Sequence, residues 1–463
     1  MSFIHQHIAR REFLKRAASV SAFTGTTFAA NLATMGDAAA QTATDFKALV
    51  CVFLYGGNDQ ANTIIPTTTA QYNQYVTARN GVALPLTGLQ AISPLATGAG
   101  AYTGPALALH PQLAGIKRLF DAGNCAVLAN VATLVQPTSK TQYRNDVFLP
   151  AQLFSHSDQQ NSWQTGFPDS PSQTGWLGRA GDLMLSQNSA SPVSICMSLA
   201  GNNTIQAGTN VIQYQLTNNG SVQISGISPQ NGLYGNTANA ALLQAVLQES
   251  SGNILENEFA KIATRSINAD GAVRAALATA PATTSALIPG NPLSAQLNLV
   301  ARMIAARNSL GHKRQIYFVA LGGFDTHSSL INDHAIRLGF LSSALEAFYN
   351  ATVTLNIQNN VTTFTASDFG RSLLANGDGS DHGWGGHHFI VGGAVQGQRL
   401  YGRWPDTALD SADDAREGRL IPTTSVDEYA ATLAKWFGIT GTADLAAVLP
   451  HLGRFANYNT GFL

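Results

Sequence analysis

The chain has 463 residues, of which 45% are hydrophobic and 11% are charged, and its 26 lysines and arginines nearly balance its 27 aspartates and glutamates. This balance leaves no basic field that would hold nucleic acid or an anionic membrane surface, so neither is expected as a partner. The length allows one large α/β domain or two smaller ones, each with a substantial core.

The N-terminus has the layout of a twin-arginine export signal. Arg10 and Arg11 precede a mildly apolar stretch at 17–33, and three alanines at 38–40 offer a small-residue cleavage site. The alternative is a basic amphipathic helix of the mature protein. We expect residues 1–40 to be a signal peptide, the export machinery to be a partner, and the protein to be periplasmic or secreted. No other stretch has the ~18 uninterrupted apolar residues of a membrane span.

Five buried strands are predicted by short apolar runs that end in glycine or polar residues. Helical patterns lie between these runs, and strands that alternate with helices favour an α/β fold with a largely parallel sheet. We therefore expect residues 41–463 to form a single domain around that sheet. In chain order, the predicted strands lie within residues 46–59, 125–131, 191–199, 315–327 and 361–370.

Three helices are predicted from apolar side chains at helical spacing. One of them begins with Asn291 as its N-cap and Pro292 at the first helical position. Another begins with a capping box that joins Ser425 and Glu428. The three helices lie within residues 110–123, 291–311 and 425–438.

Two further features concern the polar regions and the thiols. Residues 200–237 are rich in Asn, Gln, Gly and Ser, so we interpret them as a polar insertion over one face, followed by a mostly helical stretch at 238–280. Each cysteine lies in an apolar run, which predicts core packing and not a disulfide framework or a thiolate metal site. An unpaired surface thiol is the alternative. The cysteines are Cys51, Cys125 and Cys196.

Aspartates follow three of the predicted strands within a few residues: Asp59, Asp325 and Asp368. Functional groups gather at the carboxyl ends of strands in parallel sheets, so these acids are expected at one edge. A carboxylate there binds a hard or borderline cation through oxygen. The alternative for Asp59 is that it caps a turn or the next helix together with Asn62.

The segment after the fourth strand reads "GGFDTHSSLINDH". Asp325 and His327 occupy alternate positions of an extended segment, so both side chains can reach one ion, and Asp with His is a suitable zinc or manganese ligand pair. A turn with a helix cap is the alternative. His334, further along, is expected on the surface of the following helix.

Near the C-terminus, "GDGSDHGWGGHH" gathers histidines on a glycine-rich loop. Core packing does not explain His382 and His387 on such a loop, and Asp381 is expected to fix the tautomer of His382. A glycine-rich turn with solvated histidines is the alternative. Arg371 can hold an oxyanion with two hydrogen bonds, or it can pair with a buried carboxylate.

Together these residues suit one or two divalent ions, with zinc favoured over manganese or calcium. Such ions polarise a phosphoryl or sulfuryl group. Ser155 is the candidate nucleophile, with an ordinary polar loop as the alternative. The sequence has no Gly-x-Ser-x-Gly elbow, no P-loop and no dinucleotide fingerprint. The predicted metal ligands are Asp59, Asp325, His327, Asp368, His382 and His387.

Six segments, taken in chain order, stand out: "FLYGGNDQANTIIP", "LALHPQL", "GGFDTH", "SDFGRSLLANGDGSDHGWGGHHFIVGGAVQG", "YGRWP" and "LIPTTSVDEYAATLAKWFG". Together they resemble the DUF1501 family of exported bacterial proteins. The resemblance covers nearly the whole mature chain in order. It implies a fold similar to the alkaline phosphatase and sulfatase superfamily, with a central mixed sheet between helices and metals at the strand ends. It also implies a metal-dependent hydrolase ancestry, but no particular reaction.

Under this resemblance, Asp59 matches the first metal aspartate of the superfamily and Asp325 matches the second. The histidine that accompanies the second aspartate lies two residues later here, at His327, and not four. This departure, with the next one, implies one ion in place of two, a rebuilt site, or no catalysis.

The later motif also departs from the superfamily pattern. Asp368 matches the aspartate of a usual Asp-His pair, but Phe369 stands where the histidine belongs. His382 or His387 matches the late histidine ligand. Ser155 lies where the nucleophile is expected.

The sequence therefore predicts an exported metal-dependent hydrolase that acts on a phosphate or sulfate ester, either a small molecule or a polymer. In this hypothesis Ser155 or a water molecule attacks, and Arg371 steadies the oxyanion. The competing hypothesis is a non-catalytic binding protein of the cell envelope on the same fold.

Overall fold

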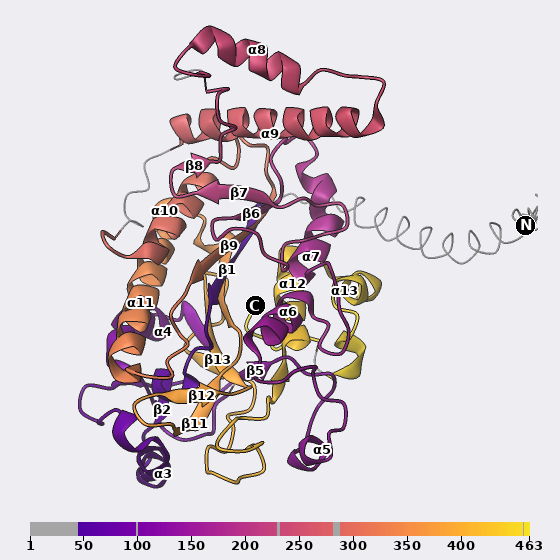
Figure 1. Cartoon of the computed structure of the whole chain (residues 1–463). Coiled ribbons are helices and arrows are strands. Elements are labelled where there is room, and N and C mark those ends of the chain that lie inside the picture. Colours follow the sequence, from indigo (N-terminus) through magenta and orange to yellow (C-terminus); the bar gives the residue numbers. More distant parts are fainter. Residues whose placement is uncertain (1–44, 99–100, 229–231, 281–287, 457) are drawn as a thin grey trace, which may run out of the picture.

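The computed structural model of the chain describes residues 45–98, 101–228, 232–280, 288–456 and 458–463 (Figure 1). The expected signal peptide at residues 1–40 lies outside these ranges. No helix in the described part of the chain is both long and apolar enough to cross a membrane.

A ten-stranded mixed sheet forms the centre of the protein, in the order β14-β5-β13-β10-β1-β9-β6-β7-β8, and β15 pairs with β5. The predicted α/β fold with a largely parallel sheet is therefore confirmed. The strands are β1 (Lys47–Leu54), β5 (Cys125–Ala132), β6 (Cys196–Ser198), β7 (Tyr214–Thr217), β8 (Gly220–Ser221), β9 (Arg314–Leu321), β10 (Val361–Ser367), β13 (Gly386–Val391), β14 (Arg399–Tyr401) and β15 (Thr424–Ser425).

Strand β1 lies between β10 and β9 and is parallel to both. Its last residue, Leu54, is in register with Ser367 on one side and Leu321 on the other. The three strands thus end level with one another, and the loops that follow them start side by side. Strand β13 runs antiparallel between β10 and β5.

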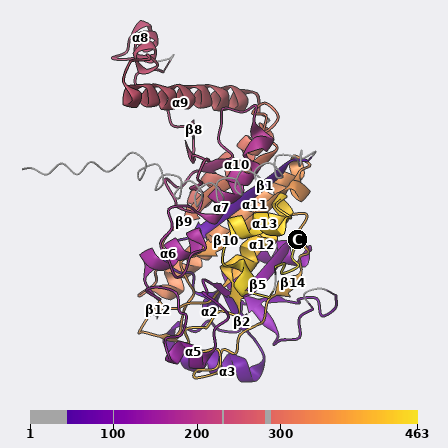
Figure 2. The ribbon, with the colours of Figure 1, turned by 90° about the vertical axis from the view of Figure 1, so that its right-hand side faces the viewer.

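Two layers of helices cover the sheet, one on each face (Figures 1 and 2). The first layer holds α4 (Ala114–Asp121), α10 (Pro292–Ala305) and α11 (Leu330–Thr354). The second layer holds α6 (His156–Thr165), α7 (Trp176–Met184), α12 (Val426–Phe437) and α13 (Thr442–Val448).

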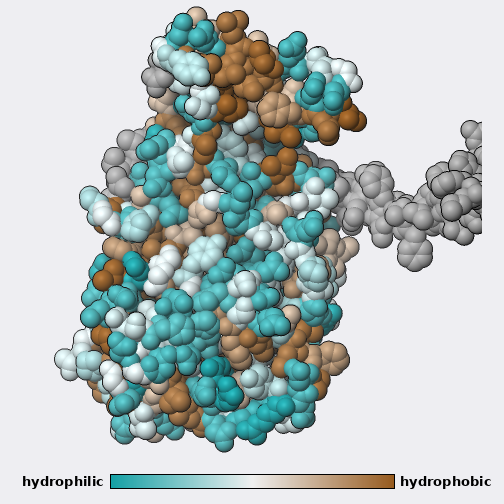
Figure 3. All heavy atoms as spheres, in the orientation of Figure 1, coloured by the Kyte–Doolittle hydropathy of each residue, from teal (hydrophilic) through white to brown (hydrophobic). Residues whose placement is uncertain are grey.

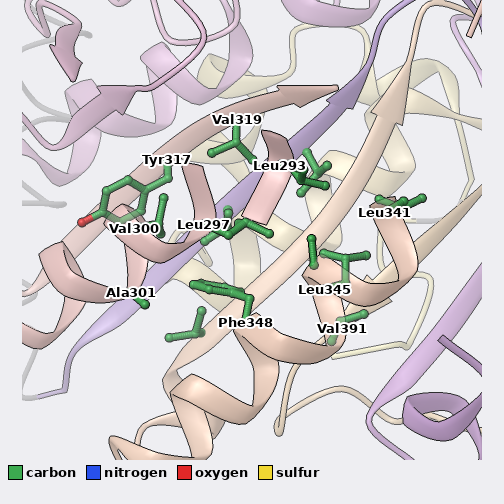
Figure 4. Close-up of a cluster of buried hydrophobic side chains, with 14 of the residues drawn as sticks. Leu293, Leu297, Val300, Ala301, Tyr317, Val319, Leu341, Leu345, Phe348 and Val391 are labelled. Atoms are coloured by element: carbon green, nitrogen blue, oxygen red, sulfur yellow. The ribbon is translucent and has the colours of Figure 1, made fainter. Parts of the chain in front are cut away.

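Successive side chains of a strand point to opposite faces, and this alternation builds two hydrophobic cores. In β1, Val50 and Val52 pack in the core beneath α10 and α11, whereas Cys51 and Phe53 pack beneath α7 and α12. Figure 4 shows the first core, in which side chains of α10, α11 and the sheet meet.

The remaining elements surround this body. Two short sheets, β11–β12 and β2–β4–β3, lie near one end of it, and the α8–α9 pair lies at the opposite end (Figure 1). Their bounds are α2 (Gln60–Thr63), β2 (Ile64–Pro66), α3 (Thr69–Arg79), β3 (Gln90–Ile92), β4 (Leu107–Leu109), α5 (Lys140–Arg144), α8 (Thr237–Leu247), α9 (Ile254–Thr279), β11 (Arg371–Ala375) and β12 (Ser380–His382).

Several local predictions are confirmed. The Asn291 side chain caps α10, and Ser425 with Glu428 forms the capping box of α12. All three cysteines are buried and unpaired, as expected for core packing. The interpretation of residues 200–237 as a polar insertion over one face stays a prediction, and the strands β7 and β8 in this stretch extend one edge of the sheet.

One carboxyl group is buried without full compensation. Asp427, in the first turn of α12, is 2% exposed, and its Oδ1 has no hydrogen-bond partner in the described part of the chain. Burial raises the pKa of Asp427 to about 7, although the charge of Arg179 opposes this in part. The folded protein therefore holds this group protonated at mildly acidic pH.

We expect Asp427 to make the protein less stable as pH rises. In the unfolded chain the group ionises near its ordinary pKa of 3.8. Between about pH 4 and pH 7 the folded state therefore binds more protons than the unfolded state, and the free energy of unfolding falls by on the order of 2–4 kcal/mol. Thermal unfolding between pH 5 and pH 8 should show a smaller decline in Asp427→Asn than in the wild type.

The exposed residue Asp146 supplies the control, since Asp146→Asn should leave the wild-type pH profile unchanged. Identical pH profiles for Asp427→Asn and the wild type would contradict the assignment of a buried, titrating carboxyl group.

Candidate functional site

The candidate site lies at the carboxyl edge of β10, β1 and β9. Because these parallel strands end level, the loops that carry Asp368, Gly56 and Asp325 come together there. Helix α6 contributes its first residue, His156, whose ring lies next to the carboxylates of Asp368 and Asp325. The site is therefore assembled from segments that are far apart in the sequence.

Two glycines let these loops pack closely. Gly56 has φ +112°, and a Cβ on it would lie 2.3 Å from the backbone nitrogen of Asp325. Gly57 has φ +83°, and its Cβ would lie 2.4 Å from the ring of Phe369. A larger residue at either position is strained by its positive φ and crowded by its neighbours.

Three side chains converge at this edge: His156, Asp325 and His382 offer one ligand atom each, and these atoms lie within 4.8 Å of one another. The His156 Nε2 atom is 3.4 Å from Asp325 Oδ2, and the His382 Nε2 atom is 3.3 Å from Asp325 Oδ1. We refer to these three residues as the ligand cluster. Two imidazole nitrogens and a carboxylate oxygen form a donor set of the kind that holds zinc.

Hydrogen bonding fixes the ring of His156. Its Nδ1 lies 2.7 Å from Asp368 Oδ2, and because a carboxylate only accepts, Nδ1–H donates. The Nε2 lone pair then points toward the ligand cluster, and Nε2 is buried with no hydrogen-bond partner among the described residues. The hydrogen bond to Asp368 raises the pKa of His156, against the effect of burial.

Asp368 connects the site to its surroundings. Its Oδ2 also accepts hydrogen bonds from Gly56 N at 3.0 Å and from Gln160 Nε2 at 2.9 Å. Its Oδ1 is buried and has no hydrogen-bond partner in the part of the chain that the structure describes. Asp368 therefore orients His156, while Oδ1 is left as a free acceptor beside the site.

His382 is fixed in the same manner but by a backbone group. Its Nδ1–H donates to the carbonyl oxygen of Phe154 at 2.7 Å, so its Nε2 presents a lone pair. Burial lowers the pKa of His382, and the carbonyl bond opposes this. The ring of Phe369 packs against both imidazoles, with centroids 4.8 Å from His156 and 4.8 Å from His382.

His327 lies at the outer side of the cluster and is half-exposed. Its Nε2 is 2.8 Å from His382 Nε2 and 3.1 Å from Asp325 Oδ1. Its Nδ1 is 3.3 Å from Asp381 Oδ1. The prediction that Asp381 orients His382 is therefore wrong, because Asp381 accompanies His327 and the Phe154 carbonyl orients His382.

Arg371 is fully buried and pairs with Asp325. Its Nη1 donates to Asp325 Oδ1 at 2.7 Å and to Gly56 O at 3.0 Å, and its Nε donates to Ser380. Burial raises the pKa of Asp325, but the hydrogen bond and charge of Arg371 outweigh burial and lower it. Arg371 therefore pairs with a carboxylate, as in one of its two alternatives, but this carboxylate is partly exposed and not buried.

Asp59 lies behind the cluster and not within it. Its Oδ2 forms a buried ion pair with Arg79 at 2.5 Å and accepts from Ser380 Oγ at 2.9 Å. Its Oδ1 accepts from Asn62 N at 2.9 Å, so Asp59 caps α2. The geometry matches the capping alternative, and the charge that balances Asp59 is an arginine.

Two other predicted site residues also make separate contacts. His387 is buried in β13, where its Nδ1 accepts from Asn130 N at 3.0 Å and its ring stacks on Trp404. Burial lowers the pKa of His387 to about 3, and His388 adds to this. Ser155 occupies the N-cap position of α6, and its Oγ donates to Asp158 Oδ2 at 2.6 Å.

The expectation of a surface position for His334 is wrong. The residue is 1% exposed, and its Nε2–H donates to Asn58 Oδ1 at 3.0 Å. Helix α11 packs with this turn against the sheet, which is why the side chain faces inward.

His156 was not among the predicted ligands. The segment "SHSDQQ" contained a usable signal, because His156 and Gln160 are four residues apart and lie on one helix face. Both contact Asp368 in the structure.

The sequence of the chain matches one family model. A family model described as "Protein of unknown function (DUF1501)" matches residues 46–449. The chain belongs to the DUF1501 family. No curated protein matches it.

Three solved structures are similar to this DUF1501 protein at low levels. One is described as Ps i-CgsB in complex with k-i-k-neocarrahexaose, with 12% identity, 90% of this chain and 78% of that chain covered, and a TM-score of 0.31. Another is the C-terminal periplasmic domain of EcEptC from Escherichia coli in complex with Zn. Its identity is 11%, the match covers 86% of this chain and 84% of that chain, and the TM-score is 0.30. The third is a mutant of alkaline phosphatase PafA. Its identity is 13%, the match covers 71% of this chain and 64% of that chain, and the TM-score is 0.26. Likeness at this level assigns no activity to the chain.

We expect Gly57→Ala to destabilise the protein, because the added Cβ meets the ring that packs on His156 and His382 and the backbone has positive φ. The free energy of unfolding in denaturant should fall by about 1–3 kcal/mol. Gly81→Ala is the matched control, since a Cβ there meets nothing within 4 Å. An equal effect of both substitutions would show that the Gly57 contact is unimportant.

Proposed function

We propose that the protein binds one divalent metal ion, preferably zinc, through His156, Asp325 and His382, and that it hydrolyses phosphate or sulfate esters. The observation that carries the proposal is the buried Nε2 of His156, which has no hydrogen-bond partner in the described ranges and whose ring is oriented by Asp368. A buried polar atom without a partner is costly, and a cation beside it removes that cost.

The donor set supports zinc over the other candidate ions. Two imidazole nitrogens and one carboxylate suit zinc or manganese, whereas calcium takes six to eight oxygen ligands. His327 Nε2 lies 3.1 Å from Asp325 Oδ1 and 2.8 Å from His382 Nε2, beside this donor set and not part of it. The three cysteines are buried in the core, so they supply no thiolate to this site.

The charge of the site supports one ion and not two. Arg371 already places a positive charge 2.7 Å from Asp325, and Arg79 neutralises Asp59. A second ion would repel the first and Arg371, and the nearby carboxylates of Asp368 and Asp381 would offset this in part. We therefore propose a rebuilt site that holds one ion in place of two.

A divalent ion held here supplies a Lewis acid that polarises a phosphoryl or sulfuryl oxygen. His327, half-exposed and with Asp381 at its Nδ1, is placed to hold or transfer a proton at Nε2. Ser155 keeps a proposed role as the attacking hydroxyl because it precedes His156 directly, and the Asp158 carboxylate that it contacts can accept its proton. Arg371 acts on Asp325 in this scheme and not on the substrate.

The proposal includes export to the periplasm or beyond the cell. Its support is the paired arginines at residues 10 and 11 followed by the apolar stretch, as in twin-arginine signals. The proposed ester substrate is a small molecule or a polymer.

A second candidate function is a metal-binding protein of the cell envelope without catalysis. The commitment of Arg371 to Asp325, Gly56 and Ser380 favours it, because Arg371 is then not free to grip an oxyanion.

We expect the full chain, purified after export, to contain close to one zinc ion, measured by elemental analysis. His156→Asn should lower the metal affinity by at least about tenfold, because asparagine keeps a donor for Asp368 and lacks Nε2. His387→Asn is the matched control, since it keeps an acceptor for Asn130 N, and it should bind metal like the wild type. Equal metal content in both variants would exclude His156 as a ligand.

We expect hydrolysis of aryl phosphates or aryl sulfates by the metal-loaded protein, with kcat/KM reduced at least about a hundredfold in Asp325→Asn. Asparagine keeps a hydrogen-bond acceptor for Arg371 but loses the charge, so thermal unfolding should confirm that the variant folds. A protein that binds one metal ion but hydrolyses neither class of ester would contradict the hydrolase proposal and favour the metal-binding protein without catalysis.

A further inference from the structure

Helices α8 and α9 form a hairpin that projects from the body at the end opposite the candidate site (Figures 1 and 2). Only the C-terminal half of α9 is anchored, where Val273, Ala276 and Leu277 join the core beneath α10. Asp270 in the same half accepts a hydrogen bond from Ser221 of β8. The N-terminal half of α9 and nearly all of α8 therefore extend away from the sheet.

The projecting part of the hairpin exposes large apolar side chains. In α9, Leu255, Phe259 and Ile262 recur at helical spacing and form one stripe, and in α8, Leu242 and Val246 are one turn apart. Figure 3 shows the apolar surface over this part of the molecule. The exposed fractions run from 53% to 82% for Leu242, Val246, Ile254, Leu255, Phe259 and Ile262.

The apolar stripe borders a groove. A cavity of about 580 Å³ lies between the end of α8 and the start of α9, and its apolar lining includes Val246, Leu247, Leu255 and Phe259. The two helices of one copy thus leave space that side chains from another helix can fill.

The exposed apolar area of the hairpin is large. Its six large apolar side chains, each more than half exposed, sum to on the order of 800 Å² of surface over the two helices. About 800 Å² is also what one partner contributes to a standard protein–protein interface. The hairpin therefore offers enough surface for a stable association.

The charges of the hairpin indicate which partner it takes. Its acidic residues slightly outnumber its basic ones, so it has no basic face that would attract anionic lipid. Charges of both signs occur along α9, where Glu258 lies 3.4 Å from Lys261 and 3.6 Å from Arg265. The charged residues of 237–279 are Glu249, Glu256, Glu258, Lys261, Arg265, Asp270 and Arg274.

We propose that the α8–α9 hairpin docks against the same hairpin of a second copy of the chain. In a two-fold arrangement with antiparallel α9 helices, the apolar stripes face each other and the glutamates of one copy lie opposite Lys261 and Arg265 of the other. Phe259 fills the groove of the other copy. The resulting four-helix contact leaves both candidate sites at the far ends, so this inference is independent of the proposed hydrolysis.

Sedimentation velocity of the full chain over micromolar concentrations tests the proposal. The wild type should be a dimer, and Phe259→Glu should weaken dimerisation at least about tenfold, because a charge replaces an apolar side chain at the centre of the contact. Ile336→Glu on α11 is the matched control, since Ile336 is half-exposed but far from the hairpin, and it should dimerise like the wild type. Far-UV circular dichroism checks that both variants are folded.

Cross-linking gives a second measurement. All three native cysteines are buried, so Phe259→Cys adds a thiol that is far more accessible, and mild oxidation should yield disulfide-linked dimers. Ile336→Cys should yield none. A monomeric wild type with no cross-linked Phe259→Cys would overturn the proposal. A monomer that binds lipid vesicles through the hairpin would also overturn it, because the occupant would then be a membrane.

Discussion

The candidate site depends on one carboxylate oxygen. Asp368 Oδ2 accepts hydrogen bonds from the loop after β1, from the first residue of α6 and from Gln160 one turn later. These three donors belong to segments that meet only because β1 and β10 are parallel neighbours that end level. Asp368 thus joins the sheet to the helix layer, and the direction of the His156 ring follows from it.

Positive charge is already built into the site around this carboxylate. Arg371 and Arg79 each neutralise an aspartate that the sequence pattern predicted as a metal ligand, and both arginines are fully buried. A buried guanidinium is permanently charged, so it does not yield its place to an ion as a protonated histidine does. Imidazoles, whose protons can be displaced, therefore make up most of the ligand cluster.

Much of the fold could be predicted because continuous apolar runs of β1, β5, β9 and β10 leave little choice other than buried strands. The common edge of Asp59, Asp325 and Asp368 followed from the same pattern. What the pattern could not provide was the partner of each acid. The arginine that neutralises Asp59 lies 20 positions away on α3, and His156 lies 212 positions from Asp368.

The two loop histidines illustrate the same limit. His382 ends β12 at the rim of the site, whereas His387 lies in β13, where pairing with β5 buries it against Asn130 and Trp404. Both belong to one glycine-rich segment, and only the three-dimensional path of the strands separates them. Residue type and spacing alone gave them equal weight.

The burial of the three cysteines has a consequence for where the chain can fold. Burial raises the pKa of Cys51, Cys125 and Cys196, so no thiolate is available for exchange or attack by oxidants. The covalent structure is then the same in a reducing cytoplasm and in an oxidising compartment. A protein of this kind can complete its folding in either environment and needs no oxidative maturation step.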